Sequence, residues 1–455
     1  MALIEKITNI ADAIRSKTGT TDTMTLAQMP ELINGIQTGG GGSSSAVSPK
    51  EVNFYDYDGK LRYAYTVAEA QKLSALPAGP QHPGLVFQGW NWSLEDVKGL
   101  TRAMNIGAMY STDDGTTRLY ITLTEGRTSP MLGVGVNGTV TVDWGDGTEP
   151  DVLTGTSTST TKWTPNHAYA ASGDYVIRLT VDGEIQLYGN NTLYNNSYLL
   201  HHATGTDNRN RAYQNALKRV EIGDHVLIGN YAFYYCTSVE TVSIPNGVTT
   251  IGTGAFNCCA SLVCIVIPDG VTSIANYLAA TCKGMDVVSI PNGVTNVGNY
   301  AFSNCYDIKS ITLPDNVTQL GNNAFTFCSN VREMFIPAMV TSIGSQAFSN
   351  CERLTSLKVP EHTTTISSSA FASCYALACV IMSKNVVAIN SQVFNACVSL
   401  GICDFTSCIT VPELKYTNAF GSTPADCEFR VPAALYDEWI AAANWATYAS
   451  QIKAY

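Results

Sequence analysis

The chain has few charged residues for its length, and most of them are acidic. Asp, Glu, Lys and Arg make up 14% of the 455 residues, the net charge is −11 and the pI is about 5.0. A protein that binds a phosphate backbone needs clustered Lys and Arg, so we expect no nucleic-acid partner. The sequence also lacks any run of ~18 apolar residues, so we expect no membrane insertion.

Motifs for catalysis and metal binding are missing as well. The sequence contains no Gly-rich phosphate loop, no HExxH and no G-x-S-x-G. Its six His are scattered, and no Cys-x-x-Cys pair occurs. We therefore predict no enzymatic activity, no cofactor and no metal. A depolymerase is the alternative, because two carboxylates can meet from distant parts of a fold.

The first residues, Met1 to Lys6, do not combine a charged region with an apolar core. This is not the pattern of a signal peptide. We therefore expect the protein to be made in the cytoplasm and, if it works outside the cell, to leave by another route.

What the sequence does contain is a long internal repeat. One Cys recurs every 23 residues, and Phe and Pro follow the same period. We call these regularly spaced cysteines the ladder Cys: they are Cys236, Cys259, Cys282, Cys305, Cys328, Cys351, Cys374 and Cys397. A fixed period of this length predicts a solenoid of stacked coils, which we place at residues 215–410.

The coil that begins at Cys305 shows the expected core. Its apolar positions should point inward: they are Ile308, Ile311, Leu313, Val317, Leu320, Ala324 and Phe325. The strand should end at Pro314, which has no N–H to donate to a neighbouring strand, and stacked coils should form a parallel sheet.

The side chains of neighbouring ladder Cys would point in parallel, which is poor geometry for a disulfide. We therefore predict free, buried thiols.

The repeat, written CxxLxxIxIPxxVxxIGxxAFxxC, resembles the BspA-like leucine-rich repeats of bacterial surface and phage proteins. It departs from that pattern at Leu278 and Ala279, which invert the usual Ala-Phe order, and at Ser383, which replaces the Pro. The inversion roughly keeps core volume.

The start of the chain should be helical. Ile4, Ile7, Ala11 and Ile14 form one stripe of a helix within residues 1–37. The stripe suits either a small helical hairpin or an oligomerisation segment. The amino-acid sequence of this segment resembles that of tail proteins of phages and prophages of gut Firmicutes. That resemblance implies attachment to other tail or baseplate proteins and a homotrimer.

Two further β domains should precede the solenoid. Residues 38–48 are a Gly/Ser linker, and residues 49–112 resemble a β-grasp repeat, with Thr66 to Glu69 as a capping box. In this domain Trp90 and Trp92 could form a carbohydrate platform, but a place in a small core is favoured.

Residues 113–190 resemble a PKD-type β-sandwich, in which Asp143 and Asp146 should build a turn rather than a cation site. We expect it to hold the solenoid away from the N-terminal anchor. Residues 191–214 are a connector, and residues 411–455 should cap the open end of the solenoid. The expected fold class is therefore mostly β and multidomain, with short N-terminal helices and a C-terminal helical cap.

Strand alternation also predicts a binding surface. The residues five and seven positions after each ladder Cys should point away from the core and line up in two columns. The predicted ligand-binding residues on these columns are Val266, Thr312, Glu333, Phe335, Lys358 and Ile381. Exposed apolar residues with a charged rim are typical of an interface. A neighbouring domain or protomer could instead cover this face, and the loops around Tyr306 and Tyr375 are the alternative site.

The leading hypothesis is a phage tail fibre or tail-like-particle protein, located on the virion, that recognises a bacterial surface protein or glycan through the repeat face. The alternative is a bacterial cell-surface adhesin with the same repeats. The lack of a signal peptide and of a C-terminal cell-wall anchor favours the first hypothesis.

Overall fold

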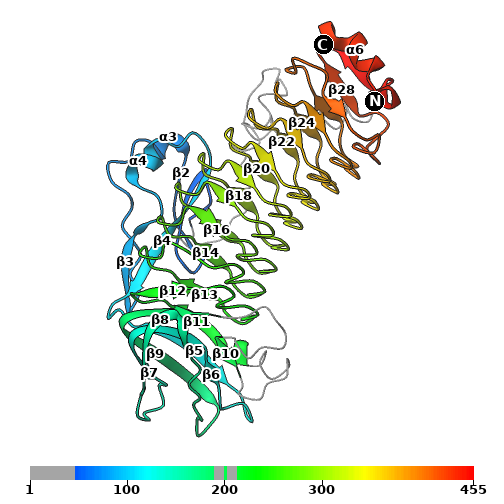
Figure 1. Ribbon diagram of the computed structural model, residues 1–455. Helices are drawn as coiled ribbons and strands as arrows, with labels where there is room; N and C mark the ends of the chain where they lie inside the picture. Colours follow the sequence, from blue (N-terminus) through cyan, green and yellow to red (C-terminus); the bar gives the residue numbers. More distant parts are fainter. Residues whose placement is uncertain (1–46, 189–198, 202–212) are drawn as a thin grey trace, which may run out of the picture. The chain divides into compact units, whose positions relative to one another are not determined.

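The structure is a computed structural model that describes residues 47–188, 199–201 and 213–455 (Figure 1). The expected class is confirmed: the chain is mostly β and multidomain, with a solenoid of about ten turns and a short C-terminal helix. The unit Met1–Ala46 lies outside the described residues. The predicted helices at 1–37 and their stripe of Ile4, Ile7, Ala11 and Ile14 therefore remain predictions. No helix among the described residues is long and apolar enough to cross a membrane.

The N-terminal domain, drawn in blue in Figure 1, is a mixed four-stranded sheet of order β2-β1-β4-β3. Its elements are β1 (Val52–Tyr55), β2 (Leu61–Tyr65), α3 (Val67–Ala70), β3 (Leu85–Trp90), α4 (Leu94–Lys98) and β4 (Met104–Thr112). Both helices start with a capping box, at Thr66 with Glu69 and at Ser93 with Asp96. Trp90 and Trp92 are 5% and 4% exposed, so they belong to the interior and form no surface platform.

The second domain is built around a large antiparallel sheet. Its strands are β5 (Thr117–Leu123), β6 (Met131–Leu132), β7 (Val134–Asp143), β8 (Asp151–Trp163), β9 (Gly173–Leu187) and β10 (Leu200–His201). β5, β9, β7 and β8 are neighbours in the sheet, while β6 and β10 form a separate two-stranded ladder. Asp143 accepts a hydrogen bond from the Gly145 N–H, and Asp146 accepts one from the Thr148 N–H. These bonds build the tight turn after β7.

The second domain is not a detached spacer, because its sheet continues into the solenoid. β11 (Leu217–Glu221) pairs antiparallel with β5 and parallel with β13 (Thr241–Ser243). β12 (Val226–Ile228) pairs with β9. The buried apolar residues of the second domain and of the coils form one continuous cluster. The sheet of this domain therefore closes the first coil. The expectation that the domain holds the solenoid away from the N-terminal anchor stays a prediction, because the anchor lies outside the described residues.

Two series of short parallel strands make up the solenoid. The first series is β14 (Cys264–Val266), β16 (Val287–Ser289), β18 (Ser310–Thr312), β20 (Glu333–Phe335), β22 (Ser356–Lys358), β24 (Cys379–Ile381), β26 (Ile402–Asp404) and β28 (Glu428–Val431). The second is β15 (Ser273–Ile274), β17 (Asn296–Val297), β19 (Gln319–Leu320), β21 (Ser342–Ile343), β23 (Thr365–Ile366), β25 (Ala388–Ile389) and β27 (Glu413–Leu414). Up to β26 in the first series and β25 in the second, paired residues are 23 positions apart, as in Ser310↔Glu333, so the sequence period is the strand register there. The last pairs, β26 with β28 and β25 with β27, are 26 and 25 positions apart.

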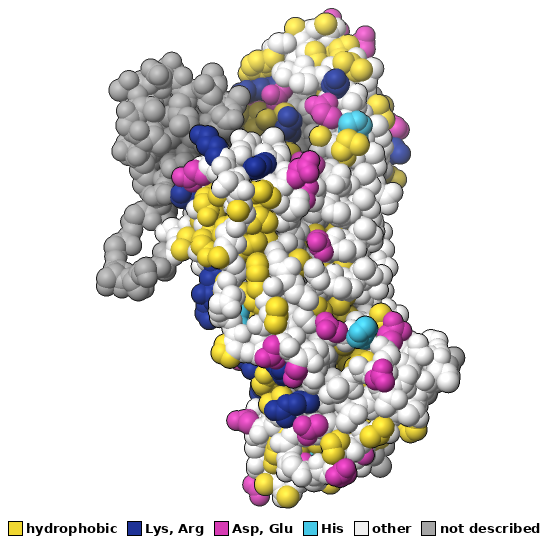
Figure 2. Space-filling view, turned by 90° about the vertical axis from the view of Figure 1, so that its left-hand side faces the viewer, with side chains coloured by type: hydrophobic (Ala, Val, Ile, Leu, Met, Phe, Trp, Pro, Cys, Tyr) yellow, Lys and Arg dark blue, Asp and Glu magenta, His cyan; other side chains and the backbone are white. Residues whose placement is uncertain are grey.

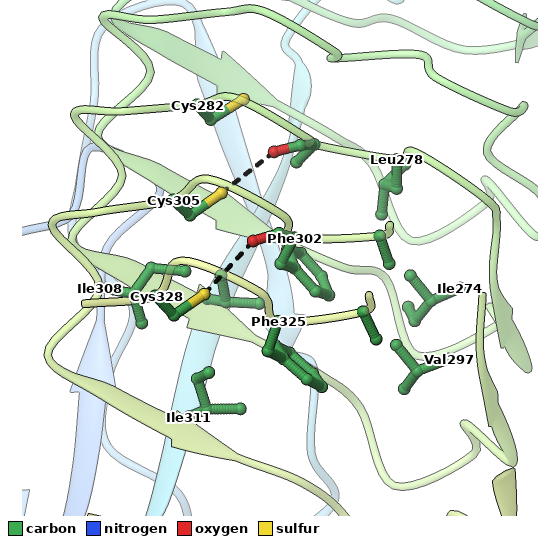
Figure 3. Close-up of a cluster of buried hydrophobic side chains, with 14 of the residues drawn as sticks. Ile274, Leu278, Cys282, Val297, Phe302, Cys305, Ile308, Ile311, Phe325 and Cys328 are labelled. Atoms are coloured by element: carbon green, nitrogen blue, oxygen red, sulfur yellow. Dashed lines mark hydrogen bonds between the residues drawn. The ribbon is translucent and has the colours of Figure 1, made fainter. Parts of the chain in front are cut away.

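The inward residues are those that the period predicts. All seven apolar positions of the coil from Cys305 are buried, with exposed fractions of 4% or less. The Phe rings of successive coils stack, with centroids 5.3 to 5.7 Å apart from Phe302 to Phe420. Leu278 and Ala279, which invert the usual order, are both buried as well (Figure 3). The inversion therefore keeps the core filled, with Leu278 supplying the bulk that Phe supplies in other coils.

The ladder thiols do more than fill space. From Cys259 to Cys397, each Sγ donates a hydrogen bond of 3.1 to 3.4 Å to the carbonyl oxygen 26 residues earlier. Figure 3 shows two of these bonds, from Cys305 to the Ala279 carbonyl and from Cys328 to the Phe302 carbonyl. Burial raises the pKa of the Cys305, Cys351 and Cys397 thiols to about 12. The ladder thiols are therefore protonated donors rather than nucleophiles.

Thiol labelling should show that the ladder Cys are buried and reduced. All fourteen Cys are free, and only Cys258 and Cys379 are incompletely buried. A maleimide reagent should therefore modify at most these two in the folded protein at neutral pH and all fourteen after denaturation. Mass spectrometry of the labelled peptides measures this. Rapid labelling of Cys305 or Cys328 in the folded protein would contradict the buried, hydrogen-bonded ladder.

The solenoid continues beyond residue 410 and then closes. β27 pairs with β25, and Phe420 stacks on Phe394. The cap contains α6 (Tyr436–Ala441), two 3₁₀ turns (Ala433–Leu435 and Trp445–Tyr448) and a last strand, β29 (Ile452–Ala454), parallel to β28. Trp439 and Trp445 are fully buried. The predicted helical cap is present, and β29 is an addition that the sequence did not suggest.

Candidate binding surface on the solenoid

The N-terminal domain covers the first part of the predicted binding face. β4 packs against β13, β14 and β16. Val266 is 4% exposed and Thr312 is 9% exposed, so the prediction that these two residues line an open surface is wrong. Their direction away from the coil core was predicted correctly. However, β4 occupies that side, and Gly107 lies so close that a Cβ there would be 2.5 Å from the methyl groups of Val266.

Asn91 is the centre of the polar contact between the domain and the coils. Its side-chain N–H donates to the Ile267 carbonyl at 2.9 Å. Its side-chain oxygen accepts hydrogen bonds from the Gly107 N–H at 2.8 Å and from the Ser289 hydroxyl at 3.0 Å. Asn91 is 1% exposed and Ser289 is fully buried. Buried polar groups satisfied in this way hold a single arrangement, because any other leaves them unpaired.

Further hydrogen bonds extend the contact along the sheet. The Trp92 indole N–H donates to the Ile290 carbonyl at 2.9 Å. Asn105 donates from its backbone N–H to the Thr312 hydroxyl at 3.2 Å, and the Asn292 amide donates to Asp96 at 2.8 Å. The buried side chains of Met109, Cys264, Val266 and Val287 fill the space between them. The domain is thus seated on the strands β14, β16 and β18.

Arg102 marks the end of the covered part. Its guanidinium donates to the Leu313 carbonyl and to Asp315, both at 2.7 Å, and lies 4.3 Å from the centre of the Phe335 ring. Burial lowers the pKa of Arg102, and Asp315 opposes that effect. Within the part of the chain that the structure describes, the outer face of the sheet is open from β20 onward, where the outward residues Glu333, Phe335, Ser356, Lys358 and Ile381 are exposed.

We call this open part the open strip and define it by Glu333, Phe335, Lys358, Ile381 and Asp404. Phe335 is 47% exposed and Ile381 is 38% exposed, while Glu333 and Lys358 are exposed and Asp404 is half-buried. The four coils that it crosses, at ~4.8 Å per strand, give a length of roughly 15–20 Å. Four predicted site residues, Glu333, Phe335, Lys358 and Ile381, therefore lie together on one accessible surface.

A second group closes the far end of the open strip. Arg430 donates to Glu428 through two nitrogens at 2.9 Å and lies 4.9 Å from the centre of the Tyr455 ring. The Tyr455 hydroxyl donates to Glu428 at 2.6 Å. An Arg over an aromatic ring thus stands at each end of the open strip.

The sequence prediction missed three parts of this surface: Asp404, Arg430 and Arg102. One further step of 23 residues from Ile381 would have reached Asp404. Arg430 pairs with Asp404 across β26 and β28, but it lies 26 residues later, so the period does not find it. Arg102 belongs to another domain, and no sequence pattern links it to Phe335.

The match to known proteins covers the repeats. Residues 208–332 and 318–423 match the family described as "BspA type Leucine rich repeat region", in six copies. No curated protein matches the chain significantly.

Similar solved structures are also repeat proteins. A leucine-rich repeat protein from Bacteroides ovatus is 25% identical over 51% of this chain and 58% of its own, with a TM-score of 0.41. TpLRR from T. pallidum is 26% identical over 34% of this chain and 72% of its own, with a TM-score of 0.32. A leucine-rich cell surface protein from Faecalibacterium prausnitzii is 25% identical over 46% of this chain and 71% of its own, with a TM-score of 0.28. The chain thus spans little more than half of the Bacteroides ovatus protein. The segment from residue 208 to residue 423 is a BspA-type leucine-rich repeat region.

Proposed function

We propose that the chain is a bacterial cell-surface binding protein of the adhesin type, and that the open strip contacts its partner. The proposal rests on one observation: part of the outer sheet face is covered by the N-terminal domain, and another part is exposed. The N-terminal domain covers β14 to β18 with buried hydrogen bonds, whereas the open strip keeps the apolar side chains of Phe335 and Ile381 exposed. Repeat folds bind along such extended surfaces.

The composition of the open strip fits a protein partner. Phe335 and Ile381 supply apolar area, and Glu333 and Lys358 supply charges of opposite sign beside it. An apolar centre with a charged rim is the usual anatomy of a protein interface. The BspA-like repeats that this region resembles occur in bacterial surface proteins, which supports a role in attachment.

Removing the two apolar side chains should abolish attachment without unfolding the protein. We expect the double variant Phe335→Ala, Ile381→Ala to bind bacterial or host cells at least ten times more weakly than the unchanged chain, because ~2 kcal/mol or more of apolar burial is lost. Flow cytometry with the fluorescent full-length chain measures the binding. Its thermal unfolding midpoint should change little, since both side chains are exposed.

A matched control lies elsewhere on the same solenoid. Val387 and Ile409 are 52% and 69% exposed and lie outside the open strip. The double variant Val387→Ala, Ile409→Ala should bind as well as the unchanged chain. Equal loss in both double variants would indicate non-specific adhesion, and full binding by the first would exclude the open strip.

The tail-fibre hypothesis uses the same binding surface but a different anchor. It rests on residues 1–37, whose wording resembles phage and prophage tail proteins and which lie outside the described residues. Attachment to tail or baseplate proteins and the homotrimer remain predictions. Immunogold labelling of producing cells separates the two hypotheses, because an adhesin decorates the cell surface and a tail fibre decorates particles.

A further inference from the structure

Three tyrosines form a row on the solenoid, away from the open strip. Tyr231, Tyr277 and Tyr300 occupy the same position of their coils, five residues before the ladder Cys, and we call them the tyrosine ridge. The rings of Tyr277 and Tyr300 are parallel within 3°, with centroids 4.8 Å apart. In the coil between Tyr231 and Tyr277 this position is Gly254, and a Cβ there would be 2.5 Å from the Tyr231 ring. The Tyr231 ring therefore lies over Gly254 and continues the row.

The stacked rings leave part of their faces uncovered. Carbon atoms in contact are ~3.5–4.0 Å apart, so two parallel rings with centroids 4.8 Å apart are displaced sideways. Tyr277 is 38% exposed, and Tyr231 and Tyr300 are half-buried. The ridge is thus a row of offset, partly exposed aromatic rings that carry phenolic hydroxyls. Such a surface offers both apolar and hydrogen-bonding contacts.

The backbone at these positions makes tyrosine a costly choice. Tyr231, Tyr277 and Tyr300 all have φ of 56°, in the left-handed region. Asn and Gly adopt this conformation more easily than bulky residues do, and the chain uses them at the equivalent positions Asn323 and Gly254. Strained residues that a fold could avoid often serve a function.

Side-chain amides run beside the ridge. Asn276 accepts a hydrogen bond from the Asn299 N–H, and Asn299 accepts one from the Asn322 N–H, both at 2.7 Å. Each bond uses the amide oxygen and fixes the side chain. The amide nitrogens remain as donors, and Asn276 and Asn322 are exposed.

The coil segments that carry the ridge contain no charged residue. Seven segments that lead up to the ladder Cys contain no Asp, Glu, Lys or Arg: they are residues 249–259, 270–282, 293–305, 316–328, 338–351, 363–374 and 386–397. Their exposed positions are Thr, Ser, Asn, Gln and Tyr for the most part. Wide areas of the solenoid in Figure 2 are accordingly neither charged nor hydrophobic. A surface that only needed solubility would carry mixed charges.

From these observations we infer that the tyrosine ridge, with Asn276, Asn299 and Asn322, is a binding site for a neutral glycan chain. A pyranose ring presents C–H groups that pack on aromatic faces and hydroxyls that pair with amides. An uncharged ligand also explains why no charged residue is needed. The coil spacing of ~4.8 Å is comparable with the length of one sugar unit, so a chain that runs along the solenoid meets the same contacts in successive coils. The site is separate from the open strip and does not depend on it.

The test replaces the tyrosines with the residue that the chain itself uses in the next coil. Affinity electrophoresis of the full-length chain through gels that contain glucan, galactan, mannan or soluble chitin oligomers should show retardation by at least one of them. The double variant Tyr277→Asn, Tyr300→Asn should lose at least tenfold in affinity. It should keep the unfolding midpoint within a few degrees, because Asn323 shows that Asn suits this backbone.

The control is another exposed aromatic residue of the solenoid. Tyr416 is 55% exposed and lies outside the ridge, so Tyr416→Asn should leave the retardation unchanged. Retardation by none of the neutral polymers, or equal retardation of the ridge variant, would overturn the proposal. Retardation only by an anionic polymer such as alginate would overturn it too.

Discussion

The free energy of unfolding should fall steeply at alkaline pH, above the ordinary thiol pKa of about 8.5. Burial raises the pKa of Cys305, Cys351 and Cys397 to about 12 in the folded protein. Above pH ~8.5 the unfolded chain therefore releases thiol protons that the folded chain keeps, and unfolding is favoured. The stabilisation is complete below ~8.5 and is lost as the pH rises toward 12. Between these two pH values each thiol lowers the free energy of unfolding by ~1.4 kcal/mol per pH unit. The three thiols together lower it by about 4 kcal/mol per pH unit.

Thermal unfolding followed by circular dichroism across this pH range, with a reductant present, measures the effect. The matched variant carries Cys305→Ala, Cys351→Ala and Cys397→Ala. It should be less stable at neutral pH, because three buried contacts and three S–H donors are lost. It should also lose stability with pH less steeply than the unchanged chain. Parallel curves for the two proteins would show that the ladder thiols do not cause the alkaline unfolding.

Replacing Asn91 with Leu should release the N-terminal domain from the solenoid. The substitution removes the side-chain partner of the Ile267 carbonyl and of the Gly107 N–H, both of them buried, and leaves the Ser289 hydroxyl with the Asn105 carbonyl alone. An unsatisfied buried group costs ~1–3 kcal/mol, so we expect a loss of about 3–5 kcal/mol. Hydrogen exchange should speed up in β4, β14 and β16, while the strands from β22 onward should keep their protection.

The control for this prediction is Val86→Ala in the same domain. Val86 is 50% exposed, so its removal should change neither stability nor exchange appreciably. Unchanged exchange of β14 and β16 in the Asn91→Leu variant would mean that Trp92 and Asn105 hold the domain in place without Asn91. Release of the domain would also expose Val266 and lengthen the accessible sheet face.

The covered and open parts of the face differ in their outward residues. Where the outer positions are small or polar, as at Ser289 and Thr312, β4 approaches closely and forms hydrogen bonds. Where they are Phe335, Lys358 and Ile381, the face stays open. The two parts thus differ at the outward positions of each coil and in the loop contacts of the covered coils, such as Asn292 with Asp96 and Asp315 with Arg102.

Much of the architecture follows from the sequence alone. The period of 23 residues determines the strand register, because it repeats the same apolar set in every coil and only in-register stacking buries it. It also places the ladder Cys in the core. A local pattern was sufficient for the first helix of the N-terminal domain, where Thr66 with Glu69 forms the predicted capping box.

Other features depend on contacts that have no period. The hydrogen bond from Asn91 to Ile267 joins residues 176 positions apart, and no repeated pattern indicates which coils β4 will cover. For the same reason the exposure of Val266 and Thr312 was predicted wrongly while that of Phe335 and Ile381 was predicted correctly. The S–H···O bonds of the ladder Cys and the sheet shared by β5 and β11 are likewise decided only by the tertiary structure. Repetition specifies how each coil stacks on the next, whereas docking between domains depends on shape and single polar groups that occur once.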